Sequence, residues 1–473
     1  MDLHQRIVSA PVDFDAIRSE FGLASDYPAE AVSEARDAVD AFAGTRVDRT
    51  DIEFVTIDPP GAMDLDQALH LERTPTGFTL HYAIADLGAV IVPGSALARE
   101  AETRGQTYYL PDGTVPLHPK VLSEDTASLL PGRDRPAALW TIELDDSAVP
   151  HRCTVTRALV RSRERFDYAQ VQAAADAGTP HPAIAALPEF GRLRIEAGLD
   201  RGAISLRLPA QEVVSHGDSW RLELEPRTAA DDWNEQVSLL TGMCAARIMV
   251  ENKGLGLLRT MPPPSRSAIE SMRHTAELLG LDWPAEMPVG RMLAGLDVNT
   301  PAALVLMSES TGLLRGAGYT LLDQLDDPAP DQLTHSAIGA PYAHVTAPLR
   351  RLADRFTTEI CLAHCAGTEV PQWVADGLKG AAETMRRTDG VAGKVDRACI
   401  DLTEATLLAP RVGTDFAAMV LRGADGSRPA EIFVEDPPIL GRCAGEPPEG
   451  ERVSVRLTVA DAESRTVTFT YPG

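Results

Sequence analysis

Positively charged residues are scarce in this sequence, and lysine is nearly absent. Only four lysines occur among 473 residues, and the 44 Lys and Arg side chains are outnumbered by 69 acidic ones, giving a net charge of −25. Phosphate binding needs local positive potential, whereas net charge describes solubility and nonspecific association rather than one site. A nucleic-acid enzyme of this composition would therefore need a basic channel inside an acidic shell.

Long hydrophobic runs and paired cysteines are also missing. No apolar run approaches the ~20 residues that span a bilayer, and the first residues lack the charged-then-apolar pattern of a secretory signal. The six cysteines lie singly except for Cys361 and Cys365, which is typical of a reduced compartment. No second ligand pair stands at zinc-site spacing from these two. The sequence therefore predicts a cytoplasmic protein with no membrane partner, no disulfide framework and no zinc site.

Hydrophobic periodicity predicts an α+β fold in three parts. Residues 1–48 have helical spacing, with an Ala-rich amphipathic stretch at 29–42. Residues 49–410 begin with strands and continue with Ala- and Leu-rich helices, which predicts one large mixed domain. Residues 411–473 return to short alternating strands between Gly and Pro turns, which predicts a small barrel of the OB type.

Individual elements follow from the same patterns. Period-two alternation predicts strands at 52–57, 78–85, 140–144, 153–160, 416–421, 431–434, 452–459 and 466–471. Apolar residues at helical spacing predict helices at 186–199, 233–251, 267–280 and 348–366.

The segment from Asp58 to Gln67 carries the most informative chemistry. Asp58 closes a predicted strand, a Pro-Pro-Gly turn reverses the chain, and Asp64 and Asp66 follow two residues apart. Side chains two apart on extended backbone point the same way, so these two carboxylates converge while Leu65 faces the opposite side. Carboxylates that meet at a turn are costly unless a divalent cation neutralises them. Such a cation can activate water in phosphodiester cleavage.

The spacing by itself is equally compatible with a structural role for these aspartates. A D-x-D pair occurs by chance among 69 acidic residues, and Asp beside Pro and Gly is ordinary turn chemistry. A structural loop that holds calcium would show the same carboxylates. An enzyme acting on phosphodiesters also needs an arginine block, which a calcium loop does not require.

A resemblance to the ribonuclease II family (the RNB catalytic domain) favours the enzymatic interpretation. The segment around Asp58 is similar to the family's Ile-Asp-Pro followed by Asp-x-Asp-Asp-Ala. Further similar blocks follow in the family's order: Ile84-Ala85-Asp86, Tyr109-Leu110-Pro111-Asp112, Val115-Pro116-Leu117, Leu122-Ser123 and the arginine block from Tyr342 to Arg351. The resemblance covers roughly residues 50–410, with an OB-type tail where the family places an RNA-binding barrel.

The resemblance implies a hydrolytic 3′→5′ exoribonuclease that needs magnesium, for which manganese can substitute. The fold would be an RNB-type mixed sheet with surrounding helices and a channel, which admits single-stranded RNA with a free 3′ end and releases nucleoside 5′-monophosphates. Asp58, Asp64 and Asp66 would hold the magnesium, with Gln67 as an altered ligand position, and Arg350 would stabilise the scissile phosphate. The residues implied in substrate binding are Tyr109, Tyr168, Glu235, Arg351 and Asp396.

Departures from the family pattern leave a second function open. The fourth family aspartate is Gln67 here, and the helical Glu-Glu pair is represented by Glu235-Gln236. The cold-shock barrels that precede the family's catalytic domain are expected to be absent, because residues 1–48 are short and have a helical pattern. A catalytically impaired paralogue that binds RNA without cutting it would show the same differences.

Each supporting residue also has a structural interpretation. Arg350, just after Pro348, is expected in the first turn of a helix and could be an ordinary surface arginine. Tyr109 could be a core residue rather than one that stacks on a base, and Tyr168 could be a core residue rather than one that contacts the terminal nucleotide and its ribose. Glu235 is predicted to be a lone buried carboxylate on an apolar helix, which is rare without a function. Residues 411–473 hold ten acidic side chains against seven arginines, a poor balance for a barrel that grips RNA.

Overall fold

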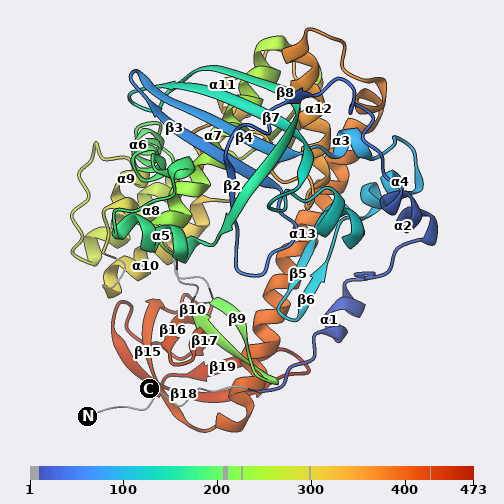
Figure 1. Cartoon of the computed structure of the whole chain (residues 1–473). Coiled ribbons are helices and arrows are strands. Elements are labelled where there is room, and N and C mark those ends of the chain that lie inside the picture. The colour runs from blue at the N-terminus through green and yellow to red at the C-terminus, as the bar shows by residue number, and fades with distance from the viewer. Residues whose placement is uncertain (1–9, 206–210, 225–226, 298–299, 427, 473) are drawn as a thin grey trace.

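The computed structural model describes residues 10–205, 211–224, 227–297, 300–426 and 428–472. A large mixed body and a small barrel are joined by one long helix, α13 (Gln372–Leu408), which runs between them in Figure 1. Its 37 residues correspond to roughly 55 Å at a rise of about 1.5 Å per residue. The helix packs against α12 at one end and against the barrel strands at the other, so it fixes the two parts to each other.

A six-stranded mixed sheet forms the centre of the large body, in the order β1-β8-β2-β3-β4-β7. Neighbouring strands are antiparallel, except that β8 runs parallel to β1 and β2. The first part of β8 pairs with β7 and its last part with β2, so this strand closes the sheet on itself. The four strands predicted in this region are confirmed as β2 (Phe54–Ile57), β4 (Gly77–Ala85), β7 (Asp134–Asp145) and β8 (Pro150–Phe166). Two further strands, β1 (Val47–Asp48) and β3 (Gln67–Thr74), were missing from the prediction.

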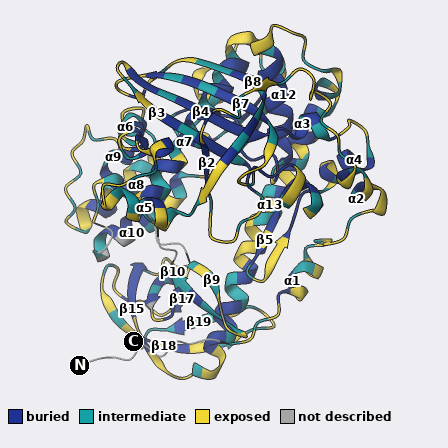
Figure 2. Ribbon diagram, in the orientation of Figure 1, coloured by how far each residue is buried: buried dark blue, intermediate teal, exposed yellow. Residues whose placement is uncertain are grey.

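Two helices bury one face of this sheet. α7 (Ala229–Asn252) and α12 (Leu352–Ala366) pack against each other, and α12 also packs on β8. Trp140 and Tyr82 from the sheet meet Leu240 of α7 and Phe356 of α12 in the main hydrophobic core. Figure 2 shows the central strands dark blue along most of their length, as expected for a sheet covered by helices.

The other elements surround this core. The remaining helices of the large body are α3 (Leu87–Val90), α4 (Ala96–Arg104), α5 (Tyr168–Asp176), α6 (Leu187–Asp200), α8 (Arg266–Leu278), α9 (Val289–Ala294), α10 (Pro301–Ser310) and α11 (Pro330–Leu333). Four short two-stranded sheets pair β5 (Tyr108–Leu110) with β6 (Gly113–Val115), β9 (Gln211–His216) with β10 (Ser219–Leu224), β11 (Leu257–Thr260) with β12 (Gly318–Leu321), and β13 (Thr334–His335) with β14 (Ala340–Pro341).

The β9–β10 hairpin lies in a region that was predicted to be mostly helical. Tertiary contacts explain the difference, because the apolar side chains of the hairpin fit two separate cores. Leu222 is buried with the barrel residues, whereas Trp220 packs edge-on against Phe14 near α13.

The C-terminal strands close into a five-stranded barrel, in the order β15-β16-β17-β19-β18. Its interior is apolar, with Val420, Ile432 and Phe469 fully buried. This confirms the predicted barrel, although one strand (β17) was missing from the prediction. The bounds are β15 (Asp415–Arg422), β16 (Ala430–Glu435), β17 (Pro438–Ala444), β18 (Arg452–Asp461) and β19 (Thr466–Thr470).

The N-terminal segment is less helical than predicted. Within residues 10–48 the helices are α1 (Asp15–Glu20) and α2 (Ala29–Arg36), so the stretch expected to be helical to residue 42 ends early. The physical reason is Asp40, whose carboxylate receives a bidentate pair of hydrogen bonds from Arg46 (2.5 and 2.8 Å) and holds the chain in a turn. Across the described ranges, none of the helices is long and apolar enough to cross a membrane.

Candidate active site

The loop between β2 and β3 carries the predicted carboxylates. The peptide N–H of Asp58 donates to the carbonyl oxygen of Phe166 in β8 (3.0 Å), which fixes the first carboxylate at the edge of the sheet. Leu65 is fully buried in the core on one side of the loop. Asp64 and Asp66 lie close enough for the charge of Asp64 to raise the pKa of Asp66. The loop therefore places its leucine and its carboxylates as the spacing predicts.

Asp66 is the most deeply placed of these carboxylates, with a side chain that is 6% exposed. Its Oδ1 accepts a 2.7 Å hydrogen bond from the peptide N–H of Leu349, and its Oδ2 lies 3.7 Å from Nε of Arg350. Burial raises the pKa of Asp66 well above its ordinary value, and the Arg350 charge opposes that rise. This pair joins the carboxylate loop directly to the arginine block, which is about 280 residues further along the chain.

Asp58 and Asp64 are partly buried. Burial raises the pKa of Asp58 to about 6, with the Asp64 charge acting in the same direction and the charges of Arg165 and Arg350 in the opposite one. Burial likewise raises the pKa of Asp64, while Arg350 lowers it. Desolvated carboxylates that repel one another favour a bound cation.

The donor atoms suit a divalent cation of the magnesium type. Oδ2 of Asp58 is buried and has no hydrogen-bond partner among the described residues, an arrangement that is costly unless an ion or water satisfies it. Carboxylate oxygens are hard ligands, and magnesium usually keeps several waters and substrate oxygens beside a few of them. Where the structure is described, however, no three His, Cys, Asp or Glu side chains are arranged to hold a metal ion by themselves.

The arginine block forms a turn rather than the start of a helix. Arg350 was expected in the first helical turn, but α12 begins at Leu352, and Arg351 has extended backbone (φ −137°, ψ 127°). The peptide N–H groups that would enter a helix are bonded elsewhere, that of Leu349 to Asp66 and that of Leu352 to Gly105. The turn leaves the Arg350 side chain 45% exposed beside the carboxylates.

Asp354 holds this turn in place. The carboxylate is fully buried, and it accepts hydrogen bonds from the Ala347 N–H (2.7 Å) and from Nε and Nη2 of Arg351 (3.0 and 2.8 Å). The Arg351 charge is therefore compensated inside the protein. Its predicted contact with substrate stays a prediction, and its described contacts are those of a residue that positions its neighbour Arg350.

Gln67 occupies the altered ligand position and is bonded at both ends of its amide. Nε2 donates to the Thr346 carbonyl oxygen (2.6 Å), and Oε1 accepts from the Tyr82 hydroxyl (2.7 Å). The same hydroxyl lies 2.8 Å from Ser238 Oγ on α7. One lone pair of Oε1 remains, so a role as a weak fourth ligand stays a prediction.

Tyr109, predicted to stack on a base, and Tyr168, predicted to contact the terminal nucleotide, both interact electrostatically with the carboxylates. Tyr109 is 51% exposed, while burial of its hydroxyl raises the pKa of Tyr109 and the nearby Asp64 charge raises it further against that of Arg350. Burial raises the pKa of Tyr168, and the nearby Asp58 charge raises it further. An exposed ring over buried carboxylates has the geometry to stack on a base.

The burial predicted for Glu235 is wrong, and the substrate role of Asp396 stays a prediction. Glu235 is not a buried carboxylate, because its side chain is 49% exposed and pairs with Nη2 of Arg227 at 2.5 Å. The wide mouth of a cavity keeps it in solvent although its helix is otherwise apolar. Asp396 is exposed on α13, and no described contact joins it to the carboxylate cluster. Its predicted substrate role stays untested by the geometry.

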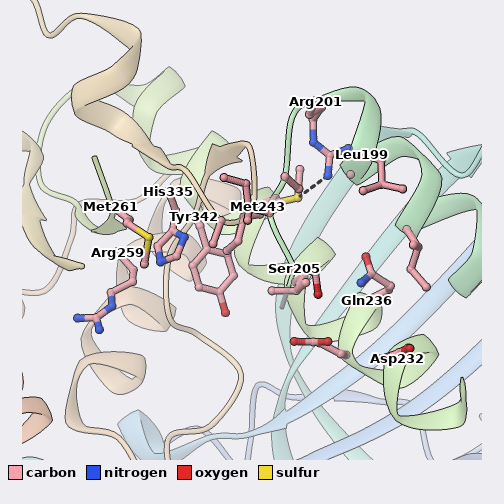
Figure 3. A pocket seen from close by; sticks show the side chains of 18 of the residues that line it. Leu199, Arg201, Ser205, Asp232, Gln236, Met243, Arg259, Met261, His335 and Tyr342 are labelled. Atoms are coloured by element: carbon pink, nitrogen blue, oxygen red, sulfur yellow. Dashed lines mark hydrogen bonds between the residues drawn. The ribbon is translucent and has the colours of Figure 1, made fainter. Parts of the chain in front are cut away.

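A cavity of about 540 Å³ lies beside the carboxylate cluster. Figure 3 shows its wall. Arg259 and His335 lie on one side of Tyr342, and Gln236 and Asp232 of α7 lie on the other. None of the clustered aspartates lines it. Its wall includes Glu235 of α7 and Tyr342 and His344 of the segment that leads to the arginine turn.

Three groups of this site could not be found from the sequence. The Leu349 N–H acts through its backbone, and Tyr82 is a fully buried strand residue like its neighbours. Asp354 stands four residues after Arg350 in a helical pattern, where an acidic residue would ordinarily face solvent. Its burial follows from tertiary packing, which single-sequence patterns do not reveal.

Comparison with known proteins identifies the class. A family model for the RNB domain matches residues 46–365, and a model for the RNase II-type exonuclease C-terminal S1 domain matches residues 414–471. The chain belongs to the RNB-domain family, and the fold expected from the resemblance is confirmed.

Among curated relatives, Ribonuclease R of Chlamydia trachomatis is 25% identical over 418 residues, covering 85% of this chain and 58% of that protein. Ribonuclease R of Escherichia coli K12 is 30% identical over 331 residues, covering 67% of this chain and 40% of that protein. The chain thus spans about half the length of the curated relatives it matches.

Solved structures agree on the fold. The apo form of Mycoplasma genitalium RNase R superimposes with a TM-score of 0.85 at 21% identity, covering 97% of this chain and 77% of that one. Yeast Ssd1, described as a pseudonuclease, gives a TM-score of 0.67 at 16% identity, covering 91% of this chain and 55% of that one. The same fold therefore occurs in proteins described as nuclease and as pseudonuclease.

Proposed function

We propose that this protein is a hydrolytic 3′→5′ exoribonuclease that uses magnesium to release nucleoside 5′-monophosphates from single-stranded RNA. The observation that carries the proposal is the pairing of Asp66 with the arginine turn. A desolvated carboxylate and an exposed guanidinium meet there beside two further carboxylates. This combination of anionic and cationic groups suits phosphodiester hydrolysis.

Different residues have different roles in the proposed reaction. Asp58, Asp64 and Asp66 would hold the magnesium, which when bound supplies an activated water and charge neutralisation at the phosphate. Arg350 donates hydrogen bonds to the scissile phosphate and stabilises the charge that develops on it. Asp354 and the peptide N–H of Leu349 keep that arginine against the carboxylates. Tyr109 stacks on a base, which tolerates any sequence.

The barrel offers a basic surface for the approaching strand despite its acidic composition. A hollow of about 530 Å³ between α13 and strands β15 to β17 is lined by four arginines and one glutamate. Glu431 pairs with Arg422 (2.8 Å) and Asp401 pairs with Arg397 (2.8 Å), so among the described residues the other two arginines carry the uncompensated charge of the hollow. The unfavourable overall charge of residues 411–473 is therefore compatible with a local phosphate site. The four arginines are called the barrel arginines below, and they are Arg397, Arg422, Arg428 and Arg442.

A non-catalytic RNA-binding protein is the second candidate. The observation that favours it is Gln67, whose amide makes internal hydrogen bonds where the family has a further carboxylate. A weaker field on the cation could leave binding intact and hydrolysis impaired.

One experiment separates the two candidates. The full chain is incubated with 5′-labelled single-stranded RNA and magnesium, and the products are resolved by length. An exonuclease acting from the 3′ end gives a ladder of progressively shorter labelled products, and EDTA abolishes it. Internal cleavage products, or a rate unchanged in EDTA, would contradict the mechanism. Intact RNA that still binds the protein would establish the non-catalytic alternative.

A further inference from the structure

The cavity lined by Arg201, Glu235 and Tyr342 has the size of a small-molecule site. Its volume of about 540 Å³ lies within the range of about 300–1,000 Å³ that small-molecule sites occupy. Its walls come from α6, α7 and β11 together with the segment 335–344. Gly242 lets this segment approach α7, because a Cβ there would lie 2.6 Å from the Ala343 carbonyl oxygen. The cavity is therefore built by close packing of separate elements.

Arg201 supplies an uncompensated positive charge at the cavity wall. The other two arginines that line it are paired, Arg227 with Asp232 (2.7 Å) and Arg259 with Asp389 (2.7 Å). Within the described ranges no carboxylate lies within ion-pair distance of Arg201, whose Nη2 has only a 3.9 Å contact with Met243 sulfur. Its neighbour Asp200 pairs instead with Arg291 (2.6 Å). This guanidinium is free to bind an anion.

The opposite wall offers flat and polarisable surfaces. The rings of His335 and Tyr342 lie 6.1 Å apart at 71°. Nδ1 of His335 is buried and has no hydrogen-bond partner among the described residues. In Figure 3 the sulfur atom of Met243 lies between these rings and Arg201, and that of Met261 lies beside His335. Aromatic and thioether groups with one unsatisfied ring nitrogen suit a heteroaromatic base.

The position of the cavity distinguishes it from the path of the polymer. The carboxylate cluster opens to solvent where the exposed Tyr109 ring and the Arg350 side chain lie. Glu235 and Tyr342 are part of the cavity wall, whereas the clustered aspartates are not. RNA bound at the opening beside Tyr109 and Arg350 prevents a released nucleotide from leaving through that opening. The product therefore needs a second compartment. A 5′-monophosphate carries close to two negative charges at pH 7, more than one backbone phosphate.

We propose that this cavity is a binding chamber for the nucleoside 5′-monophosphate product. Arg201 binds the phosphate, and the wall formed by His335 and Tyr342 contacts the base. The inference rests on the proposed function for the origin of its ligand, but the chamber itself can be tested without catalysis.

The first test is calorimetric titration of the full chain with adenosine 5′-monophosphate and, separately, with adenosine. The nucleotide should bind and the nucleoside should bind much more weakly, because Arg201 recognises the phosphate. Arg201→Glu should weaken nucleotide binding about tenfold or more, the usual effect of losing a charge-assisted hydrogen bond. Arg201→Lys should retain part of it. The control is Arg192→Ala, because Arg192 lies on α6, which ends just before Arg201, and bonds only the Pro188 carbonyl oxygen (3.0 Å) among the described residues.

The second test separates a product chamber from a substrate subsite. With excess enzyme over RNA, the rate of the first cleavage should be the same in wild type and Arg201→Glu. In steady state, inhibition by adenosine 5′-monophosphate should need about tenfold more nucleotide in the variant. Absence of nucleotide binding, binding independent of Arg201, or a first-cleavage rate that falls with the variant would each overturn the proposal. Arg201-dependent binding without any RNA cleavage would support the chamber and overturn the proposed function instead.

Discussion

The side-chain amide of Gln67 donates a 2.6 Å hydrogen bond to the Thr346 carbonyl oxygen, and so connects β3 to the turn that carries Arg350. Its other end accepts from the buried Tyr82 hydroxyl, which also contacts Ser238 on α7. A residue in a ligand position of the family therefore acts here as a connection between three elements. Whether it also contacts the cation is open to a direct test.

Replacing Gln67 by Met separates these roles. Methionine has a similar length and no hydrogen-bonding amide, so the Thr346 carbonyl loses its donor. Such a loss costs about 1–3 kcal/mol for a buried group, and the looser Arg350 turn should lower kcat. We expect the magnesium concentration for half-maximal rate to stay unchanged, measured by titrating both proteins on the same RNA. Gln324→Met is the control, since Gln324 is exposed. A rise in the magnesium requirement would assign Gln67 as a ligand.

Replacing Asp66 by Asn tests the centre of the proposed mechanism. Asparagine keeps an oxygen that can accept the Leu349 N–H and removes the charge that faces Arg350. RNA should still bind, while the cleavage rate falls roughly a hundredfold, which corresponds to about 3 kcal/mol of transition-state stabilisation. Gel-shift and single-turnover assays measure the two effects. Asp51→Asn, at an exposed aspartate just before β2, should change neither. A variant that cleaves at the wild-type rate would show that the site is assigned wrongly.

The barrel arginines should contribute to RNA affinity through phosphate contacts. Arg428 and Arg442 are exposed, and no carboxylate lies within ion-pair distance of either among the residues described. Replacing both by Ala should weaken RNA binding and reduce the slope of log affinity against log salt by about 1.4, since each phosphate contact on a single strand contributes about 0.7. Arg456→Ala, at an exposed arginine paired with Asp415 (2.8 Å), is the control. An unchanged slope in the double variant would exclude this hollow from the RNA path.

The strands and the loop of carboxylates were predictable because local patterns determine them. Runs of β-branched and aromatic residues such as Phe54 to Ile57 become sheet, and the D-x-D spacing directs two aspartates to one side of the chain. The arginine turn was not predictable as a turn, because its N–H groups are bonded by Asp66 and Gly105 from distant segments. The exposure of Glu235 also depends on a cavity that distant elements form. Helical periodicity alone cannot report such contacts.

Glu404 provides a test of the junction between α13 and the β9–β10 hairpin. Its carboxylate is 3% exposed and accepts a 2.7 Å hydrogen bond from Gln211 Nε2, which also donates to the Pro438 carbonyl oxygen of the barrel. Burial raises the pKa of Glu404 from 4.5 to about 7, against the hydrogen bond from Gln211. Between these two pH values the folded protein holds a proton that the unfolded chain releases. The contribution of Glu404 to stability therefore decreases as pH rises through that window.

Glu404→Gln removes this dependence while keeping an oxygen that can accept from Gln211. At pH 4 the side chain is mostly neutral in both proteins, so their thermal midpoints should nearly coincide. At pH 8 the variant should unfold at the higher temperature, by an amount equivalent to at most about 3 kcal/mol. Melting curves across pH 4–8 measure the difference. Glu277→Gln, at an exposed position on α8, should follow wild type throughout. A variant that is less stable than wild type at pH 8 would mean that Glu404 is charged in the folded protein and that its negative charge stabilises this junction.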